Sequence, residues 1–169
     1  MGLKYPDGRT GLFRSGTDDF KTGAKIDRMV FMWSCAKCGR EFEKEKQPHS
    51  CRKVPLEQHF KNKEKAKELF EALFKLVNTE IGKSRIISLP CCVHLFGKYD
   101  FLAALPKKDK LEVRFALNRK LDSPRLKVSV AMSAQVFKNC FDITAKEEFD
   151  DEFKGWLKEA YHLKDTEKE

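Results

Sequence analysis

Residues 33–51 read WSCAKCGREFEKEKQPHSC, and the order of cysteine and histidine in this stretch predicts a structural zinc site. A C-x-x-C pair supplies two thiolates from one tight turn. The H-x-C pair that follows the basic loop has i, i+2 spacing, which places both side chains on one face of an extended segment. Four thiolate and imidazole ligands close the shell of zinc, which is typical of a structural site. The predicted ligands are Cys35, Cys38, His49 and Cys51.

The residues around these cysteines fit the same interpretation. Gly39 follows the second cysteine and can adopt the positive φ that such a turn requires, while Trp33 and Phe42 could cover the metal. His59 is an alternative to His49 if the second half folds as a helical finger. The remaining alternative is four reduced, buried residues without metal. A stretch this short cannot build a hydrophobic core, whereas metal binding can supply its folding free energy.

The composition of the whole chain sets the class of protein. Its 169 residues predict one domain, or one domain with a small module. A hydrophobic content of 41% and 14 Phe are enough for a core, and the net charge of +8 permits binding to nucleic acid or anionic surfaces. Six cysteines without a secretory signal indicate a reducing compartment. No apolar run reaches the roughly 18 residues of a membrane span, so we expect a cytoplasmic protein that does not bind membranes.

The chain reads as four consecutive parts. Residues 1–28 are glycine-rich and mildly basic, and we expect a functionally silent flexible leader, with Met29 or Met32 as an alternative start. Residues 29–54 form the zinc module and residues 55–163 an α+β domain. Residues 164–169 form a charged, frayed tail.

Hydrophobic periodicity predicts the fold of residues 55–163. Apolar residues at three-and-four spacing predict one long helix between Pro55 and Gly82. A closing helix is expected to start at Thr144 with a capping box to Glu147. Between the helices the period changes to two, which predicts an antiparallel sheet of four or five strands packed by both helices. The expected strands are 85–89, 99–105, 111–117, 127–132 and 135–143.

Basic residues are concentrated in residues 107–127, which hold eight basic and three acidic side chains. This segment is the candidate contact surface for nucleic acid or another polyanion. Around the zinc turns, lysines alternate with Glu41, Glu43 and Glu45, which favours a solvated loop over a phosphate-binding surface. The candidate polyanion contacts are Lys107, Lys108, Lys110, Arg114, Arg119, Lys120, Arg125 and Lys127.

The run Cys91-Cys92-Val93-His94 raises a second metal or redox site. Neighbouring cysteines point to opposite sides of a strand and chelate one metal poorly. We therefore interpret both as buried thiols that pack as small hydrophobes. The chain contains no glycine-rich phosphate loop, nucleophile elbow or H-E-x-x-H run, so the sequence assembles no active site.

Several motifs together resemble a known family. The run CAKCGREFEKEKQPHSC, a Phe- and Leu-rich helix, LNRKLDSPR and FDDEFKGWLKEAY occur in this order over residues 33–163. In this they resemble a prokaryotic family without an assigned activity, catalogued as domain of unknown function fifty-six fifty-five (DUF5655). The resemblance implies a small α+β fold, often preceded by a short zinc module, and supports the four predicted ligands. It also marks residues 121–125, residues 150–152 and Trp156 as motif positions.

Two functional hypotheses follow. The first is a non-enzymatic zinc-containing module that binds nucleic acid or a nucleic-acid-processing assembly. The second is a protein-interaction or small-ligand-binding domain whose zinc is purely structural. An enzyme is the third and least favoured hypothesis. A salt-dependent affinity for DNA or RNA separates the first two, because phosphate contacts weaken as salt rises.

Overall fold

The computed structural model describes residues 33–42, 45–49 and 51–163. Contacts divide the chain into two units, Met1–Phe31 and Met32–Glu169. The first unit, which holds the expected leader, lies outside the described residues, as does the expected tail from residue 164. Within the described part, no helix combines the length and apolar character that a bilayer crossing needs.

The main sheet confirms the α+β class but has more strands than expected. It contains six antiparallel strands in the order β3-β4-β5-β6-β8-β7, so β8 lies between β6 and the edge strand β7. The missed strand is β4, which directly follows the Pro90–Cys91 turn and whose last two residues, Leu95 and Phe96, are both buried, so apolar and polar residues do not alternate along it. The strands are β3 Arg85–Ser88, β4 Val93–Phe96, β5 Asp100–Pro106, β6 Leu111–Leu117, β7 Leu126–Ala131 and β8 Phe137–Ile143.

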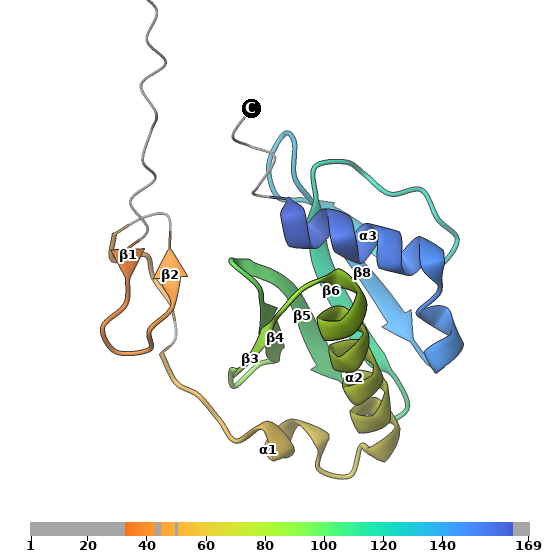
Figure 1. Ribbon diagram of the computed structural model, residues 1–169, viewed down its shortest axis with the longest axis horizontal. Helices are drawn as coiled ribbons and strands as arrows, with labels where there is room; N and C mark the ends of the chain where they lie inside the picture. Colours follow the sequence, from red (N-terminus) through yellow and green to blue (C-terminus); the bar gives the residue numbers. More distant parts are fainter. Residues whose placement is uncertain (1–32, 43–44, 50, 164–169) are drawn as a thin grey trace, which may run out of the picture. The chain divides into compact units, whose positions relative to one another are not determined.

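Helices α2 (Glu64–Leu76) and α3 (Asp151–His162) pack against one face of this sheet, over β5 and β6 (Figure 1). The alternation along β6 explains why this face is apolar, since every second residue from Leu111 to Leu117 points into the core. Phe141 stacks on Trp156 with ring centroids 5.2 Å apart. Burying a side chain of this size contributes roughly 1.5–3 kcal/mol, so this aromatic layer fixes α3 on the sheet.

The expected long helix between Pro55 and Gly82 is interrupted. It consists of α1 (Leu56–Phe60), then α2, then a π-helical turn at Val77–Ile81. The break lies at Asn62, whose φ of 57° is in the left-handed region that asparagine tolerates better than most residues. The Lys63 ammonium group donates to the carbonyl of Pro106 at 3.0 Å. This contact with the end of β5 holds the break, and nothing in the helical period signals it.

The closing helix also starts later than expected. Its N-cap is Asp150, whose carboxylate accepts from the Phe153 backbone N–H at 2.9 Å. Upstream, a short 3-10 helix occupies Lys146–Glu148. The expected capping box from Thr144 to Glu147 is wrong, because Glu148 is the residue that accepts from the Thr144 and Ala145 backbone N–H groups.

The second face of the sheet carries the polar and sulfur-bearing residues that matter for function. Strand pairing aligns His94 with Ala103, Ala103 with Arg114, and Arg114 with Cys140. Because residues opposite one another in a sheet share a face, these four side chains form a row across β4, β5, β6 and β8. This row is on the face opposite the core residues Leu95, Leu102, Val113 and Phe141.

Candidate metal centre

A small hairpin positions the first two cysteines of residues 33–51. Strands β1 (Trp33–Ser34) and β2 (Glu41–Phe42) pair in antiparallel register. Between them the Cys35 N–H donates to the Arg40 carbonyl at 2.9 Å, and the Gly39 N–H donates to the Cys35 carbonyl at 2.7 Å. Gly39 has a φ of +68°, as the turn required. The turn therefore brings the side chains of Cys35 and Cys38 to one side.

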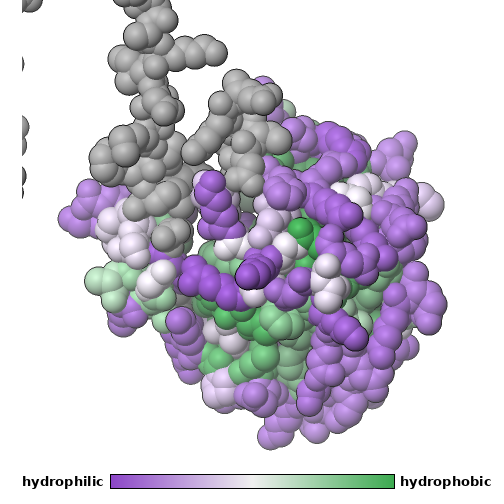
Figure 2. Space-filling view, in the orientation of Figure 1, coloured by the Kyte–Doolittle hydropathy of each residue, from purple (hydrophilic) through white to green (hydrophobic). Residues whose placement is uncertain are grey.

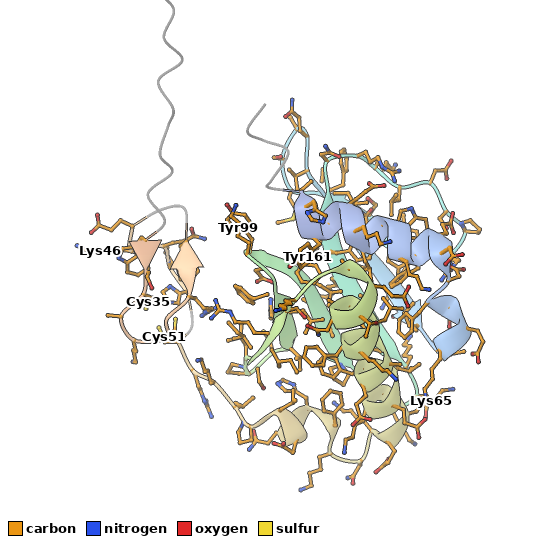
Figure 3. The ribbon with its side chains drawn as sticks, viewed as in Figure 1. Cys35, Lys46, Cys51, Lys65, Tyr99 and Tyr161 are labelled. Atoms are coloured by element: carbon orange, nitrogen blue, oxygen red, sulfur yellow. The ribbon has the colours of Figure 1, made fainter. Side chains whose placement is uncertain are left out.

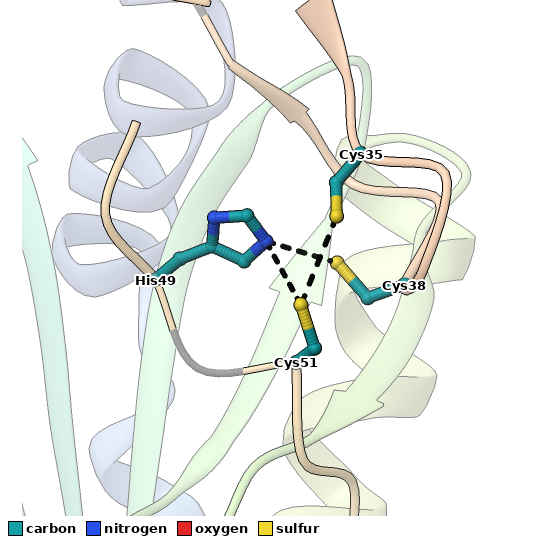
Figure 4. Close-up of side chains that lie close together, drawn as sticks. All are labelled: Cys35, Cys38, His49 and Cys51. Atoms are coloured by element: carbon teal, nitrogen blue, oxygen red, sulfur yellow. Dashed lines mark hydrogen bonds between the residues drawn. The ribbon is translucent and has the colours of Figure 1, made fainter. Parts of the chain in front are cut away.

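The structure brings the four predicted donors together (Figure 4). The sulfur atoms of Cys35 and Cys51 are 3.7 Å apart. The Nε2 atom of His49 lies 3.4 Å from the Cys38 sulfur and 3.2 Å from the Cys51 sulfur. All four donor atoms are within 4.8 Å of one another, so Cys35, Cys38, His49 and Cys51 could hold one metal ion between them.

These separations match the edges of a zinc tetrahedron. With Zn–S bonds of about 2.3 Å and Zn–N bonds of about 2.0 Å, tetrahedral angles place two sulfurs about 3.8 Å apart and a sulfur and a nitrogen about 3.5 Å apart. The observed sulfur–sulfur edge of 3.7 Å and the sulfur–nitrogen edges of 3.4 and 3.2 Å are within a few tenths of an ångström of these values. The donor set is thus closed and of the size that zinc requires.

The ring of His49 is oriented for coordination through Nε2. Its Nδ1 lies 2.6 Å from the Gln47 carbonyl, which can only accept, so Nδ1 carries the hydrogen. A hydrogen bond of this kind fixes the tautomer of many metal-binding histidines. The Phe42 ring lies 4.3 Å from the His49 ring, centroid to centroid, and Trp33 contacts both. The two aromatic residues therefore cover the imidazole.

The cluster also shifts the pKa values of its thiols. Burial raises the pKa of Cys38, but hydrogen bonds from Arg40, Cys35 and His49 outweigh it and lower this pKa to about 6. The backbone N–H of Cys38 lowers the pKa of the Cys35 thiol, whereas burial raises that of Cys51. Cys38 is therefore a thiolate at neutral pH, the form that binds metal.

His59, the alternative ligand, lies outside this four-residue group. It is part of α1, and burial lowers the pKa of its imidazole. Its Nε2 is buried without a hydrogen-bond partner among the described residues. A neutral imidazole explains this position, because a protonated ring there would carry an uncompensated charge.

Three of the candidate polyanion contacts pair with carboxylates on the outer face of the sheet. Lys127 lies 2.6 Å from Glu112 and 3.2 Å from Asp142. Lys110 lies 2.6 Å from Asp142, and the Arg114 Nε donates to Glu112 at 2.6 Å. Hydrogen bonds from lysine outweigh burial and lower the pKa values of both carboxyl groups. These basic residues are largely neutralised within the fold.

Two more candidates form ion pairs with α3. Arg119 makes a two-pronged contact with Glu159, with its Nη2 2.7 Å from one carboxylate oxygen and its Nε 3.0 Å from the other. Arg125 lies 2.7 Å from Asp150 and also donates to the Glu148 carbonyl. The Arg125–Asp150 pair joins the two motif segments 121–125 and 150–152, so these positions connect the loop before β7 to the start of α3. Lys107, Lys108 and Lys120 are exposed.

The structure also groups three donors that the sequence analysis did not expect to share a metal. Cys91, Cys92 and His94 also place their donor atoms within 4.8 Å of one another. The cysteines do not lie within a strand, as expected, but at the turn between β3 and β4. Pro90 directly before them is the one signal in the sequence that could have indicated this turn.

Two cavities of about 460 Å³ each lie in the α+β domain. One is beside α1 and α2 and is lined by apolar residues such as Phe60 and Phe74 together with charged residues such as Glu64 and Lys67. Apolar surface bordered by hydrophilic side chains is visible in Figure 2. The other cavity combines apolar walls with polar groups, among them Arg114 and Tyr161. Figure 3 shows Tyr161 near the end of α3, where its hydroxyl donates to the Lys83 carbonyl at 2.9 Å.

Part of the chain matches a known protein family. The family model described as "Domain of unknown function (DUF5655)" matches residues 56–164, well over half of the chain. The match starts after the Cys/His cluster, so it does not extend to residue 33 as the resemblance did. No curated protein and no solved structure matches the chain.

Proposed function

The chain belongs to the DUF5655 family through residues 56–164, and we propose that it is a small-ligand-binding domain preceded by a structural zinc module. Zinc is bound by Cys35, Cys38, His49 and Cys51. The observation that carries the zinc assignment is a group of four donors, three of whose separations match the edges of a zinc tetrahedron. Because four protein ligands leave no open coordination position, this zinc supports structure and not chemistry.

The free energy of folding supports the same role. Each strand of the module is only two residues long, and its buried hydrophobic surface is too small to stabilise it alone. Zinc binding contributes roughly 10–16 kcal/mol in zinc-finger peptides. The metal therefore supplies the folding energy that the module lacks.

Metal counting by native mass spectrometry tests the zinc site. Cys38→Ser should lose one equivalent of zinc relative to the wild-type chain, because it removes one of the four ligands, a thiol whose pKa is lowered to about 6. Cys140→Ser is the matched control, since Cys140 is a buried cysteine of the sheet outside both donor groups. Unchanged zinc content in Cys38→Ser would overturn the assignment.

The ion pairs favour a small ligand over nucleic acid. Affinity for nucleic acid depends on lysine and arginine side chains that are available to phosphates. Five of the eight candidates are instead paired with carboxylates in the fold. In contrast, the cavity at Tyr161 has the size and the mixture of apolar walls with a few polar groups that is typical of ligand sites.

Fluorescence anisotropy with single- and double-stranded oligonucleotides tests this choice. At physiological salt we expect no binding beyond that of a control protein of similar net charge. Tight binding that weakens as salt rises, and that is lost in the Lys107→Ala, Lys108→Ala, Lys120→Ala triple variant, would establish the nucleic-acid hypothesis instead. That variant leaves the described ion pairs intact, so its effect would report phosphate contacts and not folding.

A further inference from the structure

The turn between β3 and β4 brings two neighbouring cysteines to one side of the chain. Leu89 and Cys92 exchange backbone hydrogen bonds of 3.0 and 3.3 Å, so Pro90 and Cys91 form a two-residue hairpin loop. In a strand their side chains would alternate, but in this loop the Cys91 and Cys92 sulfurs lie 2.9 Å apart. The objection to a shared metal is thereby removed.

A histidine with a fixed tautomer completes the group. His94 is two residues beyond Cys92, and its Nε2 lies 3.1 Å from the Cys92 sulfur. Its Nδ1 lies 2.8 Å from a carboxylate oxygen of Asp100, at the start of β5. An ionised carboxylate accepts, so Nδ1 carries the hydrogen and Nε2 is left to coordinate. A carboxylate–histidine pair of this kind orients many zinc-bound imidazoles.

These donors are located at the wall of a cavity. Cys92, His94 and Asp100 line the space of about 460 Å³ that Tyr161 also borders. Arg114 and Lys138 also line it. The Cys92 and Cys140 side chains are buried, whereas Cys91 is exposed at the loop. A metal held here would be reachable from the cavity, unlike one enclosed by four protein ligands.

We propose that Cys91, Cys92 and His94 bind a second zinc ion whose fourth coordination position opens into this cavity. Two thiolates and one imidazole are among the donor sets of zinc sites that keep a position for water or a ligand. The two sulfurs must separate from 2.9 Å to about 3.8 Å to span a tetrahedral edge. Rotation of the exposed Cys91 side chain provides this movement.

The charges around the cavity bear on what the open position would take. Lys138 and Asp100 carry opposite charges at its lining, Arg114 is paired with Glu112, and two thiolates balance the charge of a zinc ion. The open position would therefore select a ligand by direct coordination to zinc, as water, azide or a carboxylate can, and not by the charge of the cavity walls. This site would define the ligand chemistry of the cavity proposed above, but it does not depend on the zinc at Cys38.

Zinc stoichiometry under reducing, oxygen-free conditions is the first test. We expect two equivalents in the wild-type chain and in Cys140→Ser, and one in Cys92→Ser, in Cys91→Ser and in Cys38→Ser. Cys91 is exposed, so Cys91→Ser keeps the test valid if the buried Cys92→Ser fails to fold. If the site at Cys38 binds no zinc, Cys38→Ser will have the same zinc content as the wild-type chain. If the site at Cys91 and Cys92 binds no zinc, Cys91→Ser and Cys92→Ser will have the wild-type content. The two failures are therefore distinguishable.

Cobalt substitution then examines the open position. In Cys38→Ser, Co²⁺ should give thiolate charge-transfer bands and tetrahedral d–d bands that shift when azide is added. These bands should be lost when Cys91→Ser is added to Cys38→Ser, which separates them from any cobalt held by the remaining Cys35, His49 and Cys51. Asp100→Asn should weaken Co²⁺ binding roughly 10–100-fold, the usual cost of losing the partner of a coordinating histidine. A Cys38→Ser protein without thiolate–cobalt bands, or one whose Cys91 and Cys92 form a disulfide in place of a metal complex, would overturn the proposal.

Discussion

Glu112 is a carboxylate with only 4% of its surface exposed, on the face of the sheet opposite the helices. Burial opposes its charge, yet hydrogen bonds from Lys127 and Arg114 outweigh burial and lower its pKa. Asp142 behaves in the same way beside Lys110 and Lys127. A buried carboxylate is stable only with such partners, so these basic residues stabilise the folded sheet by pairing with its carboxylates.

Replacing this carboxylate tests its role. Glu112→Gln should lower the free energy of unfolding by about 2 kcal/mol, because Arg114 and Lys127 lose charged hydrogen-bond partners. Urea unfolding at neutral pH measures this, with the exposed Glu147→Gln as control. Equal stabilities of the two variants would show that the ion pairs contribute nothing.

The same residue predicts a pH dependence with a definite sign. The pKa of Glu112 is lower in the folded than in the unfolded state. The contribution of Glu112 to the free energy of unfolding is therefore complete above the unfolded pKa and is lost as pH falls through the folded pKa. Wild-type stability should therefore fall below about pH 4.5 more steeply than that of Glu112→Gln. Parallel unfolding curves between pH 3 and pH 6 would contradict this.

At the scale of elements, the end of α3 is fixed by close contact with two connections. Tyr161 packs on Gly82, after the π-helical turn, and on Gly97, after β4. A Cβ atom at either glycine would lie 2.6 or 2.5 Å from the tyrosine ring. The ring cannot move freely because its hydroxyl is bonded to Lys83 and its edge contacts Phe101 at a centroid distance of 5.0 Å. Glycine is required here for close approach.

Replacing Gly97 by a larger residue should therefore weaken the packing of α3. Gly97→Ala should destabilise the domain by about 1–3 kcal/mol, the usual cost of overpacking. The control is Gly155→Ala in the middle of α3, where an added Cβ meets nothing within 4 Å. That change should stabilise by roughly 1 kcal/mol, since alanine favours helix. Thermal unfolding of both variants measures the contrast, and a stabilised Gly97→Ala would refute the packing argument.

At the scale of the molecule, we expect the Cys/His module and the α+β domain to have separate sources of stability. All members of the main core among the described residues come from Leu56 onward. The proposed zinc would stabilise the module instead. Loss of zinc should therefore unfold residues 33–54 while the sheet from β3 to β8 stays folded.

Hydrogen exchange after chelation measures this independence. Amides of residues 33–54 should lose protection in a zinc chelator, whereas those of β5, β6 and β8 should keep it. Cys38→Ser without chelator should give the same pattern, and Cys140→Ser should retain protection in both parts. Loss of protection across the whole sheet would show that the two parts fold as one unit.

Short-range sequence patterns account for much of this protein. The C-x-x-C and H-x-C spacings bring four donors together because a tight turn and an extended segment each fix the directions of their own side chains; zinc binding at these residues stays a prediction. The α+β class also followed from sequence, since apolar alternation and helical periodicity are local properties. The α2 and α3 stripes and most strands were found in this way.

Only the tertiary structure decided the features that join distant residues. The break at Asn62 depends on Lys63 reaching Pro106, and the neutralisation of Lys127 depends on Glu112 in another strand. The cysteines of the β3–β4 turn gain a partner because Asp100, six residues beyond His94, orients its ring. Each of these contacts depends on how strands and helices pack, which period and spacing do not encode. The sequence therefore determined the helices, the strands and the first donor cluster. Tertiary packing determined which basic residues are paired with carboxylates, and it assembled the second donor cluster.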